Sequence, residues 1–450
     1  MGGEQSQPEF CLCENAYGDK GIEIPILDAV WHTKDMQLVS TVGSPNFALI
    51  RRDGSVVLWG CSRCDSSSVQ AQLCNVRSIS TNGNAFAAIR EDSSVVTWGV
   101  PAMGGDSSEI VGGLFDVVAI QSTARAFAAL RADGFVVTWG DVDSGGDSRS
   151  VQEQLTNVQH LQSSVGAFAA IRSDGAVVTW GSADAGGDSS AVQEQLVGVQ
   201  ALQSSARGSF AAFAALRDDG RVVTWGDPGS GGDSSSVQEK LKRVTAIQSS
   251  KGAFAAICED GTVVTWGDAL SGGDSSHVQG LLYQVTCIQS SNQAFAALRS
   301  DGQVVWWGKA PGADQNTPPL AASGVRAVAS AARAFAAIKV DGSVVAWGDR
   351  LAGGDVSQVK EQLQQVEALS ASRLAFTALR KDGQVVSWGD PLHGGKAPDH
   401  LHQVRRVVAS QSAFAAVCGD GRVATWGHED FGGDSSAVDH QLAPVWQILG

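Results

Sequence analysis

The chain has 450 residues, of which 43% are hydrophobic and 18% are charged, and its formal net charge is −15. That charge argues against binding to nucleic acid or to anionic lipid headgroups, which it would repel. No segment approaches the ~18 consecutive apolar residues of a membrane span, and the N-terminus lacks the basic region and apolar core of a secretory signal. The eight cysteines follow no regular spacing, which favours reduced thiols over a disulfide framework. We therefore expect a cytoplasmic protein.

Residues 1–35 lie outside any repeat and are expected to form an N-terminal tail. They begin Met-Gly-Gly-Glu-Gln-Ser, which matches the N-myristoylation pattern, so Gly2 is a candidate acceptor. Cys11 and Cys13 are close enough to accept palmitate. One myristoyl chain binds a membrane only marginally, so stable anchoring would need this second acyl group. The alternative is a polar tail without lipid, and membrane association is expected only if the tail is acylated.

Residues 36–450 consist of ten copies of one unit with a mean period of about 41 residues. Each copy has a Phe-Ala-Ala strand, an Asp-Gly turn, a Val-Val-x-Trp-Gly strand and usually Gly-Gly-Asp-Ser-Ser followed by Val-Gln-x-x-Leu. The Trp-Gly steps fall at Trp59, Trp98, Trp139, Trp180, Trp225, Trp266, Trp307, Trp347, Trp388 and Trp426. Such a unit cannot bury its apolar faces alone, so the sequence predicts one continuous domain of stacked repeats.

Residues 158–196 illustrate the strands expected in each unit. Residues 158–162 alternate apolar and polar side chains and predict one strand. Two β-prone runs, Ala167–Arg172 and residues 177–180, predict two more. Asp174-Gly175 between them predicts a tight hairpin in which both central residues adopt positive φ.

The second half of the unit predicts one helical turn. Gly186-Gly187 interrupts regular structure, and Asp188 or Ser189 can cap a short helix over residues 191–196. Each unit is therefore expected to contain three antiparallel strands and one short helix.

Apolar residues occupy both faces of the expected sheets, so both faces must be covered by neighbouring sheets. The small Ala pairs beside each Phe indicate crowding at a common axis or at an interface between units. The sequence predicts an all-β, β-propeller-like array of about ten three-stranded blades. Because propellers usually have four to eight blades, an open spiral of the same units is the alternative. Residues 37–42 and 445–449 both resemble the strand expected at residues 158–162, and their pairing could close a ring.

The stretch Phe-Ala-Ala-Leu-x-x-Asp-Gly-x-Val-x-x-Trp-Gly resembles the repeat of the regulator of chromosome condensation superfamily, over about residues 36–450. The short period is similar to the three-stranded blades of the β-lactamase-inhibitor propeller of that superfamily. The resemblance implies a non-enzymatic propeller and a nuclear location as an alternative to the cytoplasm. It also implies three functions to weigh: guanine-nucleotide exchange, ubiquitin-ligase adaptor and enzyme inhibitor. Ala126-Phe127 replaces the family's His-Thr, and no long insertion resembles its exchange wedge.

No catalytic or cofactor motif stands out. The chain lacks a phosphate-binding P-loop, an H-E-x-x-H motif and a G-x-S-x-G elbow in the required context, and its repeated carboxylates belong to turns. We predict no enzyme activity and no cofactor. The periodic tryptophans are interpreted as packing residues, whereas Trp306, beside Trp307, is a candidate for an exposed contact.

Three groups of residues raise the question of a metal ion. The Gly-Gly-Asp loops suggest calcium, but each unit supplies one carboxylate. His400-x-His402 could chelate a transition metal, and Cys61-x-x-Cys64, with Cys74 beyond it and Cys11-x-Cys13 upstream, could supply four thiolates to zinc. We interpret all three as structural and predict no metal site.

Function is expected where the repeat departs from its own pattern, because packing accounts for the regular positions. Three breaks stand out: an insertion at 207–212, a Pro-rich loop at 309–324 and an irregular loop at 391–402. The candidate partner contacts are Arg207, Trp306, Lys309, Pro311, Asp314, His393, Lys396, His400 and His402. The sequence predicts a non-catalytic scaffold for protein–protein interaction and does not identify the partner.

Overall fold

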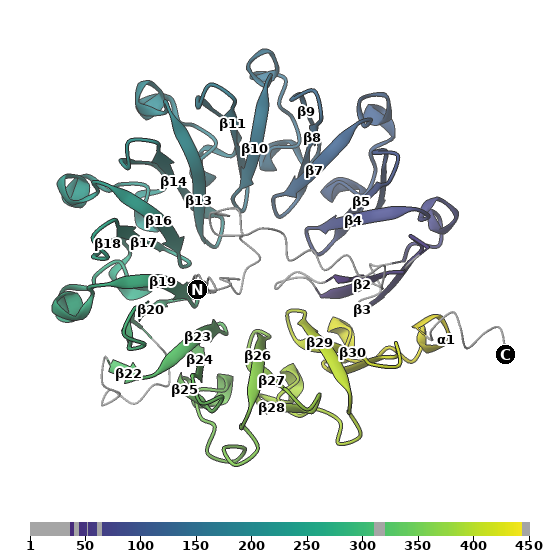
Figure 1. Ribbon diagram of the computed structural model, residues 1–450. Coiled ribbons are helices and arrows are strands. Elements are labelled where there is room, and N and C mark those ends of the chain that lie inside the picture. Colours follow the sequence, from purple (N-terminus) through teal and green to yellow (C-terminus); the bar gives the residue numbers. More distant parts are fainter. Residues whose placement is uncertain (1–36, 40–44, 52, 61–64, 310–319, 443–450) are drawn as a thin grey trace, which may run out of the picture.

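The computed structural model describes residues 37–39, 45–51, 53–60, 65–309 and 320–442. These residues form ten antiparallel sheets that follow one another in chain order around a common axis (Figure 1). We number the sheets blades 1–10. The expected all-β architecture of three-stranded blades is confirmed, with one exception in blade 7, which has four strands. None of the described helices is long and apolar enough to cross a membrane.

Each blade has a first strand, a second strand that carries the Phe and a third strand that carries the Trp. The first strands are β1 (Gln37–Val39), β4 (Val76–Thr81), β7 (Val117–Ser122), β10 (Val158–Ser163), β13 (Val199–Arg207), β16 (Val244–Ser249), β19 (Val285–Ser290), β23 (Val325–Ser330), β26 (Val366–Ala371) and β29 (Val404–Ala409). The second strands are β2 (Asn46–Ile50), β5 (Ala85–Arg90), β8 (Ala126–Arg131), β11 (Ala167–Arg172), β14 (Phe210–Arg217), β17 (Ala253–Cys258), β20 (Ala294–Arg299), β24 (Ala334–Lys339), β27 (Ala375–Arg380) and β30 (Ala413–Cys418). The third strands are β3 (Val56–Gly60), β6 (Val95–Gly99), β9 (Val136–Gly140), β12 (Val177–Gly181), β15 (Val222–Gly226), β18 (Val263–Gly267), β21 (Val304–Gly308), β25 (Val344–Gly348), β28 (Val385–Gly389) and β31 (Val423–Gly427). The additional strand of blade 7 is β22 (Leu320–Ala322).

Short 3-10 helices connect the blades. One group directly follows the third strands: η3 (Pro101–Met103), η5 (Val142–Ser144), η7 (Ala183–Ala185), η9 (Pro228–Ser230), η11 (Ala269–Ser271), η13 (Arg350–Ala352), η14 (Pro391–His393) and η15 (Glu429–Phe431). A second group precedes the next first strand: η2 (Gln70–Gln72), η4 (Ser108–Gly113), η6 (Gln152–Gln154), η8 (Ser190–Gln195), η10 (Ser235–Lys240) and η12 (Ser276–Leu281). The last blade ends with one turn of α-helix, α1 (Asp439–Leu442).

The helical turn expected at 191–196 is η8, a 3-10 helix displaced by one residue. Its Val192 N–H donates to the Ser189 carbonyl three residues earlier (3.0 Å), and a segment this short gains little from an α-helical ladder. The capping expectation holds for Asp188, whose Oδ1 accepts from Ser190 N–H (2.9 Å). Ser189 makes no capping bond.

The hairpin differs from its prediction. Only Gly175 of the Asp-Gly pair has positive φ (75°). Its N–H donates to the Arg172 carbonyl, while Arg172 N–H donates to the Ala176 carbonyl, both at 2.9 Å. This is a three-residue loop whose glycine forms a bulge, so the predicted turn with two positive-φ residues is wrong. Asp174 supports the loop through its side chain instead, because Oδ1 accepts from Ala176 N–H (3.1 Å).

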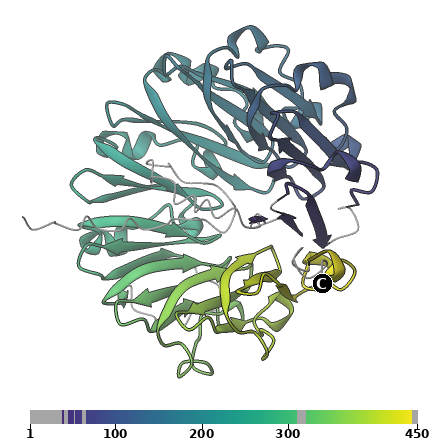
Figure 2. The same ribbon diagram turned by 45° about the vertical axis from the view of Figure 1, so that its right-hand side comes forward.

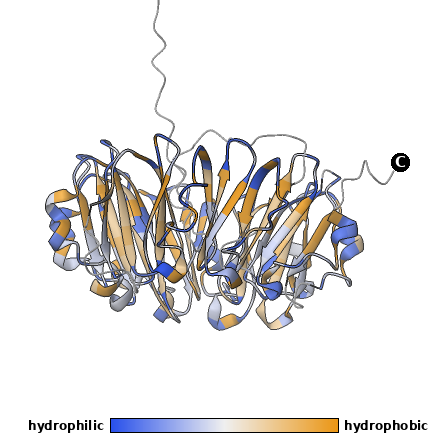
Figure 3. Ribbon diagram, turned by 90° about the horizontal axis from the view of Figure 1, so that it is seen from below, coloured by the Kyte–Doolittle hydropathy of each residue, from blue (hydrophilic) through white to orange (hydrophobic). Residues whose placement is uncertain are grey.

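The core lies between the blades. Phe168 and Trp180 are a cross-strand pair with stacked rings 5.2 Å apart. They pack on Ala126 and Ala128 of the preceding blade. Alanine leaves room for the two rings, so the Ala pairs mark the interface between blades. Seen from the side, the strands are largely hydrophobic and many connecting turns hydrophilic (Figure 3).

Blade 10 lies beside blade 1 (Figure 2), and residues of the two blades form one buried cluster of the kind that joins consecutive blades. The Trp180 indole N–H donates to the Gly145 carbonyl of the preceding blade (3.0 Å). In the same way, the Trp59 indole donates to the Gly432 carbonyl of blade 10 (3.1 Å). The ring is therefore closed, and the alternative of an open spiral is wrong. Residues 445–449, expected to pair at the closure, lie outside the described part of the chain.

Candidate functional site

In the regular blades, a helical turn covers the edge of the third strand that faces away from the second. In blade 4, Gln193 Nε2 donates to the Val177 carbonyl (2.9 Å) and Ser189 Oγ donates to Gln193 Oε1 (2.9 Å). The hydroxyls of Ser189 and Thr179 lie 2.9 Å apart. We call these four residues the edge network. It recurs in blades 3, 5 and 6 at Val136, Thr138, Ser148 and Gln152, at Val222, Thr224, Ser234 and Gln238, and at Val263, Thr265, Ser275 and Gln279.

Blade 9 lacks this covering turn. The segment from Gly394 to Leu401 is three residues shorter than its counterpart from Gly186 to Leu196. No 3-10 helix lies between η14 and β29, a stretch that the structure describes completely. The missing turn would have carried the Gln of the edge network, and no described side chain donates to the Val385 carbonyl in its place.

A groove of about 430 Å³ opens where this turn is missing. Residues 384–387, at the edge of β28, form one side, and residues 396–402 form the other. Val359 and Gln362 contribute from the connection between blades 8 and 9. We call this the edge groove. It contains Lys396, His400 and His402, three of the predicted contact residues.

A second groove, of about 450 Å³, lies between residues 398–402 and blade 10. Its lining includes Arg422, Asp434 and the thiol of Cys418. The backbone N–H of Ser436 donates to Asp434 (2.8 Å) and lowers the pKa of its carboxyl, so Asp434 is charged at neutral pH. Burial raises the pKa of the Cys418 thiol, so the cysteine is neutral. Segment 398–402 therefore lies between two grooves whose linings include charged side chains.

The structure separates the three predicted histidines. His393 lies in η14, where its Nδ1 is 3.0 Å from Asp390 Oδ2, and it lines neither groove. His400 and His402 line both grooves, and His402 Nδ1 donates to the His400 carbonyl (2.8 Å). In the described part of the chain, no three His, Cys, Asp or Glu side chains are placed to hold a metal ion.

The insertion at 207–212 lengthens a hairpin. β13 and β14 extend to the pair Arg207 and Phe210 around a two-residue turn that begins with Gly208 at φ 69°. Arg207 lies 3.8 Å from Asp268 of blade 6, and Phe210 is 48% exposed. Sequence analysis selected Arg207 but missed Phe210, although an aromatic residue within the insertion was visible there.

Blade 7 contains the other predicted contacts. β22 pairs with β21 in place of the usual helical turn. Trp306 on β21 is partly buried and packs against the cluster between blades 7 and 8, so most of its surface serves packing. Lys309 is exposed, and its backbone N–H donates to the Gln293 carbonyl (2.8 Å). Pro311 and Asp314 lie outside the described residues.

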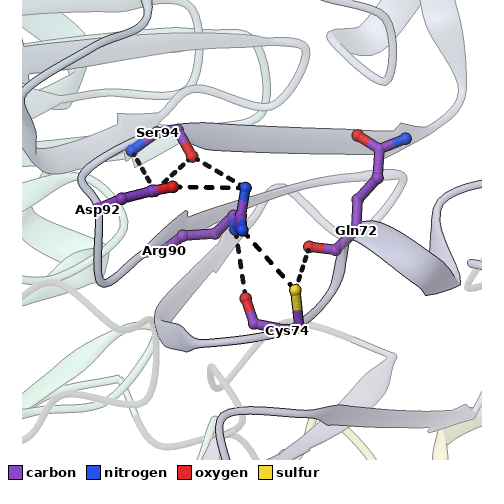
Figure 4. Close-up of polar contacts among 5 residues, drawn as sticks. All are labelled: Gln72, Cys74, Arg90, Asp92 and Ser94. Carbon is purple, nitrogen blue, oxygen red and sulfur yellow. Dashed lines mark hydrogen bonds and ion pairs between the residues drawn. The ribbon is translucent and has the colours of Figure 1, made fainter.

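Cys74 is the described member of the suggested zinc group. Arg90 donates from Nη2 to Cys74 Sγ (3.7 Å) and from Nε to its carbonyl (3.2 Å) (Figure 4). Cys74 Sγ in turn donates to the Gln72 carbonyl (3.8 Å). Cys74 therefore has a structural role between a strand and a loop. Cys61 and Cys64, like Gly2, Cys11 and Cys13 of the tail, lie outside the described residues.

Comparison with known proteins gives structural neighbours only. No protein-family model and no curated protein matches the chain. Prp20p from Saccharomyces cerevisiae, in a structure described with its binding properties to Gsp1p and histones, is 14% identical, with 78% of this chain and 88% of that chain covered and a TM-score of 0.34. Human WBSCR16 is 15% identical, with 51% and 76% covered and a TM-score of 0.34.

A second structure of Prp20, titled yeast RCC1 (Prp20) bound to Kap60, matches at 15% identity, with 95% of this chain and 85% of that chain covered and a TM-score of 0.33. These structures and the present one are similar in fold only. The low identities and TM-scores assign no function.

Proposed function

We propose that the protein is a non-catalytic scaffold that binds a protein partner at blade 9. The observation that supports this is the contrast between blades. In blades 3 to 6, side chains of the loop and of the third strand form hydrogen bonds with one another in the edge network. In blade 9 the shortened segment leaves two grooves with polar and charged linings.

The grooves favour protein binding over a small ligand. Both run along one loop and are open to solvent on one side, whereas small-molecule sites enclose most of their ligand. Their charges are mixed: Lys396 and Arg422 lie near Asp399 and Asp434. Protein interfaces combine an apolar centre with a polar rim, and both linings contain apolar as well as charged residues. No described feature favours nucleotide exchange, a ubiquitin-ligase adaptor or enzyme inhibition, which stay alternatives.

The test is to restore the missing turn. Residues 396–400 are replaced by the eight residues 188–195 of blade 4, which contain the Ser and Gln of the edge network. We expect the full-length graft to lose the specific partner of the wild type, with recovery reduced about tenfold or more in quantitative affinity capture.

The matched control exchanges residues 274–281 of blade 6 for residues 188–195, which have the same length and the same edge network. This control should capture the partner as the wild type does. Equal capture by the blade 9 graft, or no partner specific to the wild type, would contradict the proposal.

A further inference from the structure

We infer that the free edge of β28 in blade 9 accepts an extended segment of a protein partner as a fourth antiparallel strand. This inference rests on the proposed function and specifies how the partner binds. It combines three observations: the direction of the backbone groups at this edge, the covering of the same edge in other blades, and the strand that the chain itself adds in blade 7.

The register directs backbone groups of β28 into the edge groove. Arg380 N–H donates to the Gln384 carbonyl (2.9 Å), and Leu379 and Val385 are the next pair of the ladder. Hydrogen-bonded and non-hydrogen-bonded pairs alternate in an antiparallel ladder. Val385 is therefore in a non-hydrogen-bonded pair, and its N–H and C=O point away from β27. An edge of this kind is a template for another strand.

The same edge is covered in the regular blades. In blade 4, the Val177 carbonyl accepts from Gln193, and Val177 and Thr179 are 1% and 9% exposed. Their counterparts in blade 9, Val385 and Ser387, are both half-buried. Ser387 Oγ is 2.8 Å from Thr377 Oγ1 on its own sheet, so it needs no partner from a covering loop. Blade 9 therefore keeps its three-stranded sheet without a helical turn over the edge of β28.

Blade 7 shows that an antiparallel strand fits this edge. β22 pairs with β21 through Val304 and Ala322 and through Val305 and Leu320. Both valines are fully buried. Val304 occupies the same position on β21 as Val385 on β28, since each is the first residue of its third strand. The chain therefore already adds one strand at the equivalent place, and blade 9 leaves that place open.

The walls of the edge groove indicate the chemistry of the added segment. Side chains of a strand alternate between two faces, and Val359, Val386 and Ala397 supply apolar surface at the groove. Lys396 stands where most units have the Asp of Gly-Gly-Asp, so this position carries a positive instead of a negative charge. Because Asp399 also lines the groove, the segment should be extended, with an apolar residue next to a carboxylate that faces Lys396.

The test uses a random octapeptide display library, selected on the full-length protein and counter-selected on the blade 9 graft. Enriched peptides are synthesised, and their Kd is measured by fluorescence polarisation. We expect Val385→Pro to weaken binding about tenfold, as for one lost hydrogen bond, because proline removes the outward N–H. Proline is tolerated at such an edge because that N–H bonds no strand of the blade. Val177→Pro, at the covered edge of blade 4, should leave binding unchanged.

Peptides N-methylated at alternate residues provide a readout that does not depend on the variants folding. Methylation at one parity should abolish binding, and methylation at the other parity should be tolerated, since alternate residues direct their N–H groups to opposite sides. Failure to enrich any peptide, or equal binding by both methylated series, would overturn the inference.

The proposed function can fail separately. A cellular partner that is lost with the graft but retained by Val385→Pro would leave the blade 9 scaffold intact and rule out strand addition. A partner retained by both variants would contradict both.

Discussion

At the scale of single residues, the interface between blades depends on a glycine that only just fits. Gly231 has φ 93°, and its carbonyl accepts from the Trp266 indole (3.0 Å). A Cβ there would lie 2.7 Å from Cδ2 of Phe254. The residue must therefore adopt a left-handed conformation and also leave space for a ring.

We expect Gly231→Ala to lower the free energy of unfolding by about 2–4 kcal/mol, from backbone strain and overpacking together. The measurement is urea denaturation followed by tryptophan fluorescence. Gly280→Ala is the control, since nothing lies within 4 Å of the added carbon and its φ is not positive. A loss at Gly231 no larger than at Gly280 would disprove the role of this contact.

At the scale of elements, the loop aspartates stabilise the turns that begin the second group of helices. Arg149 donates to Asp147 through its side chain and its backbone N–H, and the pKa of Asp147 falls from 3.8 to about 2. The backbone N–H two residues later also lowers the pKa of Asp188. A lowered pKa stabilises the folded state above the unfolded pKa, and this stabilisation is lost as the pH falls through the folded pKa.

For Asp147 the stabilisation should therefore disappear between about pH 4 and pH 2. We expect the stability difference between wild type and Asp147→Asn to be constant above pH 5 and to shrink through this range, measured by urea denaturation at each pH. Arg149→Ala removes the largest cause of the lowered pKa. The stability difference between wild type and Arg149→Ala should therefore also shrink as the pH falls. A difference independent of pH would contradict this assignment.

The sequence predicted the strands well where neighbouring residues determine where a strand begins and ends. Ala167–Arg172 is strand β11 to the residue, because β-prone residues end there at a turn. The hairpin type was wrong because Asp174 keeps an ordinary φ and bonds Ala176 through its side chain. The edge groove of blade 9 could not be predicted, since it results from the absence of a long-range contact. In blade 4 that contact joins Gln193 to the Val177 carbonyl, sixteen residues away in the chain. The 391–402 break itself was visible in the sequence, although its residue His393 lines neither groove.

At the scale of the whole molecule, closure of the ring distinguishes this protein from a linear array. Sequence could not decide it, because ten similar units stack equally well in a spiral. What decides it is the interface between blades 10 and 1, where Phe47 and Trp59 pack against Ala413 and Ala415. Gly432 approaches the Phe47 ring as Gly231 approaches the Phe254 ring, with a virtual Cβ at 2.5 Å.

We expect Gly432→Ala to destabilise the protein at least as much as Gly231→Ala does, by about 2–4 kcal/mol. Small-angle scattering should also show a larger radius of gyration for the Gly432 variant, because only its interface holds the ends of the array together. If the ring were open in solution, Gly432→Ala would resemble a surface substitution in both measurements.

The contact between Trp59 and Gly432 also sets how many units the chain can hold. A full turn shared by ten blades gives each interface about 36°. Nine such interfaces bring blade 10 back to blade 1, and the tenth closes the circle. A chain with one unit fewer would keep every local contact and still leave a gap of one wedge, and one with an extra unit would collide with its own beginning. Closure of the ring therefore constrains the number of repeats. Duplication or deletion of a whole repeat should destabilise the protein.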